Sequence, residues 1–119
     1  MNAGNQQNVA GLVDMIGDRV KVYDVTNKKF TWDEDKHKIN KRKHKISFEE
    51  ASSVFDDDYA VYFDDESHSY DEDRFIIIGV SKLDRLLLVC HCYREDDLII
   101  RIISARRATK TESGLYGGA

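Results

Sequence analysis

The C-terminal half of the chain alternates between long apolar stretches and short polar segments. The three longest apolar stretches are residues 74–80 (RFIIIGV), 85–93 (RLLLVCHCY) and 98–104 (LIIRIIS). Because the segments between them, SKLD and REDD, are short and polar, the pattern predicts three strands that pair antiparallel as a meander. Shorter strands are predicted at residues 20–25, 30–32 and 59–63.

Two helices are predicted before this meander. Asp33 is expected to cap the first, a mostly exposed basic helix that runs to about His44, with Ile39 among its few apolar positions. Ser47 and Glu50 form a capping box, in which the Ser47 hydroxyl accepts from the amide of Glu50 and the Glu50 carboxylate returns to the amide of Ser47. The buried stripe of the second helix is predicted to be Phe48, Ala51, Val54 and Phe55.

One more helix is predicted at the end of the chain. Thr109 and Glu112 form a second capping box, and Gly114 keeps this helix short. The order of elements predicts an α+β domain with a mostly antiparallel sheet of four to five strands, two helices before it and a short C-terminal helix. Residues 1–29 are expected to form a partly flexible leader, and residues 30–116 the domain.

The long strands are apolar at nearly every position, which is typical of a sheet that is covered on both faces. Two helices cannot cover both faces of such a sheet. Either one face contacts a partner or a second copy of the chain, or the C-terminal helix and the N-terminal segment cover it.

The composition indicates a single folded domain. The chain has 119 residues, of which 41% are hydrophobic and 34% charged, so a disordered chain is excluded. Its two cysteines are one residue apart, which favours a reducing compartment. No apolar stretch approaches the ~20 residues of a membrane span, so we expect a cytoplasmic protein that does not contact a membrane.

The net charge of −4 conceals one strongly acidic segment. Residues 56–73 hold nine acidic and no basic residues, so the rest of the chain carries +5. Because charge acts over about one Debye length, the negative total does not exclude a nucleic-acid partner. The acidic segment is either a solvated loop or a docking surface for a basic arm of a protein partner.

The triplet Cys90-His91-Cys92 is a candidate metal site. On a strand the two sulfur atoms point to one face and the imidazole to the other, whereas zinc requires about four convergent ligands. A Cys–His nucleophile fails for the same geometric reason. We therefore interpret the cysteines as core residues and predict no metal and no cofactor, with a metal-binding regulator as the alternative.

Arginine is the residue type that indicates a site. Arg101 interrupts the stretch LIIRIIS, Arg74 opens another stretch, and Arg106 and Arg107 follow the last. A buried guanidinium is costly unless it is paired, so these side chains either form ion pairs, for example with Glu112, or line an anion site. Their forked donors suit phosphate oxygens, as RNA cleavage without a histidine pair requires.

Several short motifs of the chain resemble those of one known family. They are FTWD at residues 30–33, KHKISFEEA at 43–51, VFD at 54–56, EDR at 72–74, GVS at 79–81 and IISAR at 102–106. In this order, over about residues 30–116, the chain is similar to the BrnT toxins. The family often has glycine where Lys45 and Asp84 stand here, and the leader before Phe30 is longer than the family needs.

The resemblance implies a RelE-like fold and a ribonuclease toxin of a type II toxin–antitoxin pair, which cleaves RNA without a metal ion and inhibits translation. It also implies a hetero-oligomer with a BrnA-like ribbon-helix-helix antitoxin. That antitoxin neutralises the toxin and represses the shared operon, so operator DNA is contacted only through it. The alternative is a catalytically inactive relative that binds the antitoxin and co-regulates the operon.

Roles for the candidate residues follow from the chemistry of RNA cleavage, in which a 2′-hydroxyl loses a proton and a pentavalent phosphate forms. We assign the transition-state charge to Arg101 and Arg106. Arg74 is expected to position the substrate, with Glu72 orienting it or acting as base. His44 is either an acid or base near neutral pH or a structural residue. The predicted substrate-binding residues are Lys36, Lys43, Arg107 and Lys110.

Overall fold

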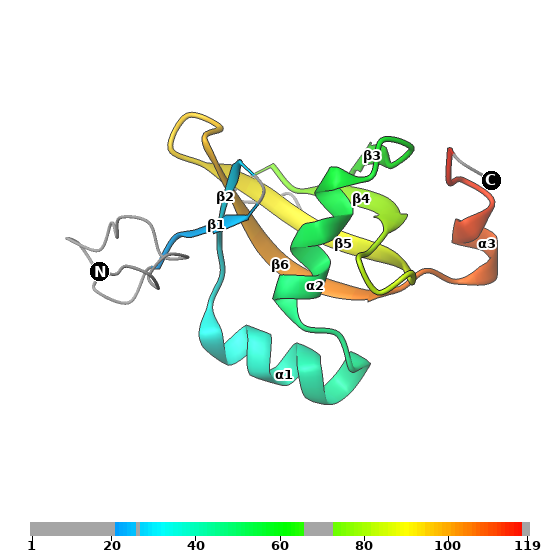
Figure 1. Cartoon of the computed structure of the whole chain (residues 1–119), viewed down its shortest axis with the longest axis horizontal. Coiled ribbons are helices and arrows are strands. Elements are labelled where there is room, and N and C mark those ends of the chain that lie inside the picture. The colour runs from blue at the N-terminus through cyan, green and yellow to red at the C-terminus, as the bar shows by residue number, and fades with distance from the viewer. Residues whose placement is uncertain (1–20, 26, 66–72, 118–119) are drawn as a thin grey trace.

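Six strands form one sheet in the computed structural model, which describes residues 21–25, 27–65 and 73–117 (Figure 1). The strands are β1 (Tyr23–Val25), β2 (Lys28–Thr31), β3 (Val61–Asp64), β4 (Phe75–Val80), β5 (Leu86–Arg94) and β6 (Ile99–Arg107). The helices are α1 (Glu34–His44), α2 (Phe48–Ser53) and α3 (Lys110–Ser113), and the 3-10 turn η2 (Val54–Asp56) directly follows α2. The strand order across the sheet is β1-β2-β6-β5-β4-β3.

The predicted antiparallel meander is confirmed, since β3 pairs with β4, β4 with β5, and β5 with β6. The expected α+β class is also confirmed, with two helices before the meander and one after it. The expected number of four to five strands is wrong. Both β1 and β2 join the sheet, because β2 pairs in parallel with Ile99–Arg101 of β6.

The two ends of α1 are set by local backbone geometry. Asp33 caps the helix as predicted, and its carboxylate accepts from the amides of Asp35 and Lys36 at 2.8 and 3.2 Å. The helix ends at Lys45, whose φ of 63° is left-handed, and Asp84 has a similar φ of 65°. These are the two positions at which the resemblance places glycine, so this chain keeps turns that glycine adopts at lower cost.

The buried face of α1 is polar. His37 and Asn40 are its buried residues, whereas Ile39 is 54% exposed. Ile39, one of the few apolar positions expected in this helix, therefore does not contribute to the core. The ring of His37 stacks on Phe48 with the centroids 4.9 Å apart and lies edge-on to Trp32, so it packs as an aromatic side chain.

Asn40 is buried because it pairs with the backbone of two other segments. Its Nδ2 donates to the carbonyl oxygens of Ile46 and Ala105 at 3.0 and 2.8 Å. Its Oδ1 accepts from the N–H of Ala105 at 3.1 Å. Since β2 is paired with β6 only as far as Arg101, Asn40 takes the place of a neighbouring strand beside Ala105. β6 extends to Arg107, three residues beyond the predicted end at residue 104, because it stays paired with β5 as far as Leu87.

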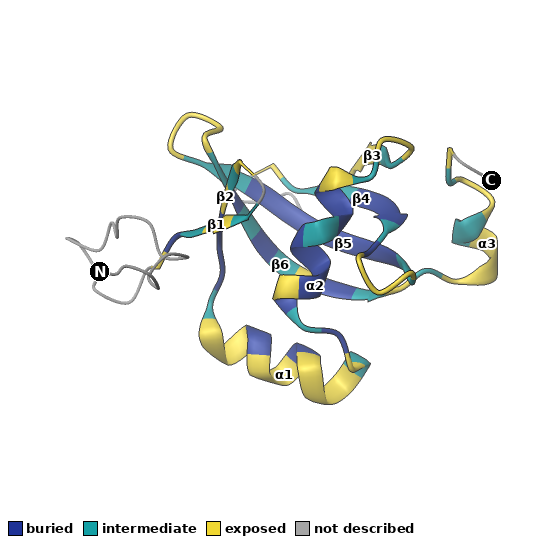
Figure 2. Cartoon of the chain, viewed as in Figure 1, coloured by how far each residue is buried: buried dark blue, intermediate teal, exposed yellow. Residues whose placement is uncertain are grey.

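The apolar core lies between the helices and one face of the sheet (Figure 2). All four residues of the stripe predicted for α2 and η2 are buried, which confirms that prediction. Facing them from the sheet are Phe30, Ile77, Leu87, Val89, Ile100, Ile102 and Ala105. A Cβ on Gly79 would lie 2.9 Å from Val54, so the absence of a side chain lets η2 approach β4.

Half of the first capping box is observed. The Ser47 hydroxyl accepts from the amide of Glu50 at 3.0 Å as predicted. The Glu50 carboxylate instead accepts from the Ser81 hydroxyl at 2.7 Å and forms an ion pair with Arg85, whose Nε lies 2.9 Å away. Because Glu50 is buried, a charged partner is worth more to it than an exposed amide. Glu50 therefore ties α2 to the turn between β4 and β5.

The capping box of α3 is complete, as predicted. The Thr109 hydroxyl accepts from the amide of Glu112 at 3.1 Å, and the Glu112 carboxylate accepts from the amide of Thr109 at 2.9 Å. Just after α3, the Tyr116 hydroxyl donates to Asp57 at 2.5 Å, which holds this end of the chain against the residue after η2. None of the helices in the described ranges has the length and apolarity to cross a membrane.

We expect Asn40→Ala to lower the free energy of unfolding by about 2–4 kcal/mol, because it leaves buried backbone groups of Ala105 without partners. Urea unfolding followed by circular dichroism measures this change. The control is Lys38→Ala, on the exposed side of α1, which should shift the free energy by less than about 0.5 kcal/mol. Equal midpoints for Asn40→Ala and the wild type would contradict the role of Asn40.

The Glu50 ion pair predicts a dependence of stability on pH. The hydrogen bond from Arg85, and then that from Ser81, hold the pKa of Glu50 below its ordinary value. A lowered pKa means that ionised Glu50 stabilises the fold above the unfolded value of about 4.3, and that this stabilisation is lost as the pH falls. We expect Glu50→Gln to unfold at lower urea than the wild type at neutral pH.

The difference between Glu50→Gln and the wild type should shrink toward pH ~3, where the carboxyl becomes protonated in the unfolded chain. Urea midpoints at the two pH values measure this effect. Asp58→Asn, in an exposed turn, removes the same charge and should follow the wild type at both. A constant difference between Glu50→Gln and the wild type would show that charge is not the cause.

Candidate functional site

A cavity of about 350 Å³ lies on the face of the sheet opposite α1 and α2. Among the described residues, its lining is Asp65, Arg74, Ile76, Leu88, Cys90, Ile103, Ser104 and Arg106. On β5, the lining residues Leu88 and Cys90 alternate with Leu87 and Val89, whose side chains belong to the core. The cavity therefore has a floor of apolar strand residues and a border of charged and polar ones.

A β-bulge in β6 determines which arginines face this side. Cys92 pairs with Arg101, and Leu88 pairs with Arg106, but the register shifts by one residue between Cys90 and His91. Partners in an antiparallel pair share a face, so Arg101 and Arg106 lie on the same side of the sheet as Cys90. In a regular strand, two residues five positions apart would face opposite sides. The extra residue also explains why the consecutive residues Ile103 and Ser104 both line the cavity.

Arg106 is held in one orientation by the start of α3. Its two terminal nitrogens donate to the two carboxylate oxygens of Glu112 at 2.8 and 2.9 Å. The hydrogen bond from Arg106 is the main cause that lowers the pKa of Glu112 to about 2, so this pair stays ionised at neutral pH. The same carboxylate completes the capping box with Thr109. Arg106 is thus both an ion-pair partner and a lining residue, which combines the two alternatives left open by the sequence.

Arg74 lines the same cavity from the residue before β4. Cys90 lies beside it, and the Cys90 Sγ donates to Asp65 at 3.5 Å. Burial, and then the neighbouring Asp65 carboxylate, raise the pKa of Cys90 to about 12, whereas the charge of Arg74 acts in the opposite direction. The thiol of Cys90 therefore stays protonated at neutral pH, and it is not an effective nucleophile.

The other predicted catalytic residues lie away from this cavity or outside the described residues. Arg101 shares the sheet face of Arg106 but does not line the cavity. It lies toward the start of α1, since its charge lowers the pKa of Asp33, a smaller cause than the amide of Lys36. His44 is the last residue of α1, in the layer on the other face of the sheet. Glu72 falls outside the described residues.

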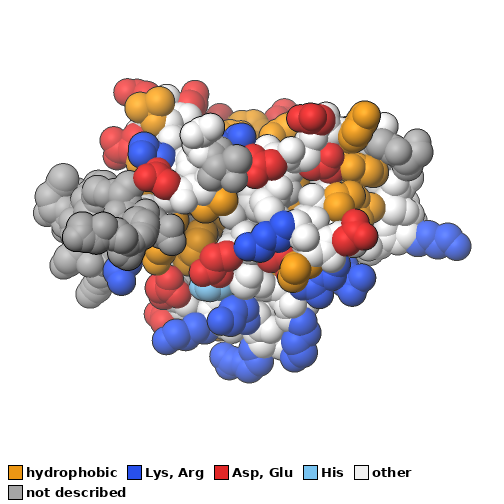
Figure 3. All heavy atoms as spheres, viewed as in Figure 1, with side chains coloured by type: hydrophobic (Ala, Val, Ile, Leu, Met, Phe, Trp, Pro, Cys, Tyr) orange, Lys and Arg blue, Asp and Glu red, His pale blue; other side chains and the backbone are white. Residues whose placement is uncertain are grey.

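The predicted substrate-binding residues are exposed at several places. Lys36 and Lys43 lie on α1, where lysine and arginine side chains gather along the lower edge of the molecule (Figure 3). Lys110 begins α3. Arg107 faces the side opposite to Arg106, because it pairs with Leu87, and its charge contributes to the low pKa of Glu50 after Arg85 and Ser81.

His91 points away from the two neighbouring cysteines, as predicted. It is fully buried and lies edge-on to Phe55 at 4.8 Å, on the helix side of the sheet. Burial lowers its pKa to about 4, so the imidazole is neutral at neutral pH. Cys90 and Cys92 are both buried and are not joined in a disulfide. Within the part of the chain that the structure describes, no three His, Cys, Asp or Glu side chains come together as a metal site would require.

Sequence reasoning missed two polar residues of the cavity. Ser104 lies at the bulge, and Asp65 lies just after β3, inside the acidic segment that we interpreted as a loop or a docking surface. The serine precedes Arg106 by two residues, the spacing that places side chains on one face of a strand. That spacing was the available signal for Ser104, whereas no local pattern distinguishes Asp65 from the acids around it.

Comparisons with known proteins agree with this fold. The model of one protein family, described as the ribonuclease toxin BrnT of type II toxin–antitoxin systems, matches residues 32–112. Among solved structures, the 1.1 Å crystal structure of the Brucella abortus ribonuclease toxin BrnT matches with a TM-score of 0.50 and 23% sequence identity. The match covers 66% of this chain and 94% of that one, and at this identity it establishes a shared fold.

No match was found among curated proteins. The family model, however, spans more than half of the chain and includes all of α1 and α2, the whole meander and the Arg106–Glu112 pair. The resemblance seen in the sequence motifs is therefore confirmed. The chain belongs to the BrnT family of ribonuclease toxins of type II toxin–antitoxin systems.

Proposed function

We propose that this chain is an endoribonuclease that cleaves RNA in the cavity on the face of the sheet opposite α1 and α2 and thereby inhibits translation. The observation that carries the proposal is that Arg74 and Arg106 line one cavity, together with Asp65 and Ser104. Two guanidinium groups supply the positive charge that a pentavalent phosphate requires, and Glu112 orients one of them before substrate binds. In this proposal the reaction does not use a metal ion.

The chemistry requires a proton acceptor beside the two arginines. We assign this role to Asp65, a carboxylate of the same cavity that accepts from Cys90. Asp65 takes the proton of the 2′-hydroxyl, whose oxygen attacks the phosphorus. The bond from phosphorus to the 5′-oxygen breaks, and that oxygen takes a proton from water. The products are a 2′,3′-cyclic phosphate and a 5′-hydroxyl, and Glu72 remains a candidate to orient Arg74.

Other predicted residues have supporting roles in this proposal. Arg101 lies on the same face of β6 and adds positive charge along the path of the RNA. The exposed residues Lys36 and Lys43 contact phosphates from α1 without regard to sequence, and Arg107 and Lys110 extend the basic surface beyond β6. His44 serves as a structural residue, because α1 lies on the other face of the sheet from the cavity.

The proposed partner is an antitoxin of the BrnA-like, ribbon-helix-helix type. Membership of a type II toxin family supports a protein antitoxin in general. In the proposal the antitoxin neutralises the toxin by forming a hetero-oligomer with it. The antitoxin contacts operator DNA, and the toxin is bound to that DNA only through the antitoxin. We also propose that the fold is RelE-like, with α1 and α2 on one face of the sheet and the RNA site on the other.

We expect Arg74→Lys and Arg106→Lys each to reduce RNA cleavage about a hundredfold, because lysine keeps the positive charge but lacks the forked donors. Cleavage of a fluorescent single-stranded RNA by the purified chain measures the rate. The control is Arg42→Lys, the same change at an exposed position of α1, which should leave the rate unchanged. Wild-type rates in both cavity variants would refute the proposed location, and an inactive wild type would favour an antitoxin-binding module.

The role of Glu112 can be separated from its capping function by a pair of variants. Glu112→Gln keeps a capping-box residue but loses the charge that holds Arg106, so we expect about tenfold slower cleavage, together with some loss of stability at neutral pH because the ion pair lowers the pKa of Glu112. Thr109→Val removes the cap but keeps the ion pair, so we expect about 1 kcal/mol lower stability with a wild-type rate. Cleavage assays and thermal unfolding of both variants provide the measurements.

The reverse pattern would contradict the orienting role of Glu112. If Thr109→Val slows cleavage while Glu112→Gln does not, the contribution of α3 is general stability. If both variants lose folding at the assay temperature, the assay is repeated below their melting temperatures, where the rates again distinguish the two roles.

A further inference from the structure

Two cavities adjoin at the end of the sheet where β5 turns into β6. One has a volume of about 600 Å³ and the other about 510 Å³. Tyr93 and Asp97 line both of them, so these two side chains form the wall between the cavities. This place lies apart from the cavity that holds Arg74 and Arg106, because the lining residues Phe75 and Tyr93 project to the helix side of the sheet.

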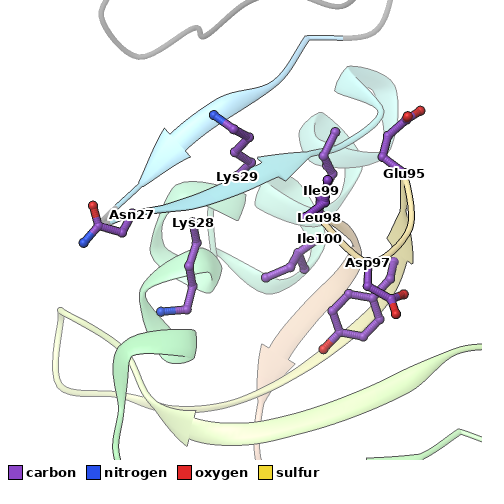
Figure 4. A pocket seen from close by; sticks show the side chains of 9 residues that line it. Asn27, Lys28, Lys29, Glu95, Asp97, Leu98, Ile99 and Ile100 are labelled. Atoms are coloured by element: carbon purple, nitrogen blue, oxygen red, sulfur yellow. The ribbon is translucent and has the colours of Figure 1, made fainter.

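The larger cavity is mainly apolar (Figure 4). Leu98, which is 72% exposed, lies beside Ile99 and Ile100 at its centre. The two lysines of its lining already have acidic partners. Lys28 pairs with Asp56 at 3.3 Å, and Lys29 pairs with Asp24 at 2.9 Å. Their positive charge is therefore compensated, and the cavity presents an aliphatic surface.

The smaller cavity combines aromatic rings with carboxylates. Its lining among the described residues is Asp73, Phe75, Tyr93 and Asp97. The ring centroids of Phe75 and Tyr93 are 5.6 Å apart with an interplanar angle of 59°. Beneath them, His91 lies edge-on to Tyr93 at 5.4 Å. Its pKa of about 4, a result of burial, keeps this ring uncharged at neutral pH.

This chemistry selects a cation. Aromatic faces attract ammonium and guanidinium groups, and the attraction grows where carboxylates stand beside the rings. The turn that follows β5 adds two more acids, Glu95 and Asp96, next to Asp97. RNA is a poor ligand for such a surface, because its phosphates would face three or more carboxylates. The two lysines in the described lining, Lys28 and Lys29, already pair with acidic residues.

We propose that the two cavities together bind a segment of a partner polypeptide that carries an arginine or lysine next to an aliphatic residue. The basic side chain enters the smaller cavity, beside the rings of Phe75 and Tyr93, and its charge is paired by Asp73 and Asp97. The aliphatic side chain lies in the larger cavity against Leu98 and Ile99. The charge complementarity identifies this occupant, and its binding does not depend on RNA cleavage.

The test uses the full isotope-labelled chain and the peptide acetyl-Ala-Leu-Arg-Ala-amide, followed by nuclear magnetic resonance. We expect saturable shifts confined to residues around Tyr93, Asp97 and Leu98, with a Kd of about 1 mM. A peptide with citrulline in place of arginine has nearly the same shape without the charge, and should bind about tenfold more weakly. Equal binding of the two peptides, or no saturable shifts, would overturn the proposal.

Variants of the chain locate the interaction. The double variant Asp73→Asn/Asp97→Asn should weaken the arginine peptide at least about fivefold, whereas Tyr93→Phe, which keeps the ring, should bind as the wild type does. The control Asp58→Asn removes a carboxylate from an exposed turn elsewhere and should change nothing. Equal loss in Asp58→Asn and the double variant would show that only the total charge matters, and would overturn the site.

Other occupants give distinct results in the same experiment. Spermidine tests for a small free polyamine, and an uncleavable 2′-O-methyl oligonucleotide tests for nucleic acid. If either produces the same shifts at lower concentration than the arginine peptide, the polypeptide occupant is wrong. Concentration-dependent self-association of the wild type that Asp73→Asn/Asp97→Asn abolishes would assign the cavities to a second copy of the chain instead.

Discussion

The amide side chain of Asn40 is the contact on which the arrangement of the rest of the molecule depends. The pairing of β2 with β6 ends at Arg101 of β6, so the backbone of Ala105, four residues further along, lies at a sheet edge. Asn40 supplies both an acceptor and a donor there and also binds the carbonyl of Ile46. An apolar side chain could fill this space but could not pair the backbone, which explains a buried amide in a basic helix.

The strand that Asn40 contacts, β6, also carries one wall of the cavity on the opposite face. The extra residue of β6 lies just before Ala105, at the bulge. Arg106 then emerges opposite Leu88 and meets Glu112, which is itself placed by the capping box of α3. The orientation of one guanidinium thus draws on contacts from both faces of the sheet and from a helix of four residues.

The elements that sequence predicted well rest on local patterns, such as the Asp33 cap and the apolar strands of the meander. The failures involve partners that are distant in the chain. Asn40 bonds Ala105, 65 residues away, and Glu50 bonds Arg85, 35 residues away, so no periodicity could show that these polar residues are buried. The arginines of the site were identifiable by type, but their common face depends on a bulge that no motif marks.

The bulge in β6 has a consequence for comparing this chain with its relatives. If the strand kept its length but lost the bulge, regular alternation would turn one of the two arginines toward the core, although both would remain in the sequence at the same spacing. A homologue could therefore retain each arginine and still have a dismantled cavity. In this family, residue identity and spacing together do not define the cavity face, since an interval of five residues needs a bulge and an interval of four needs none.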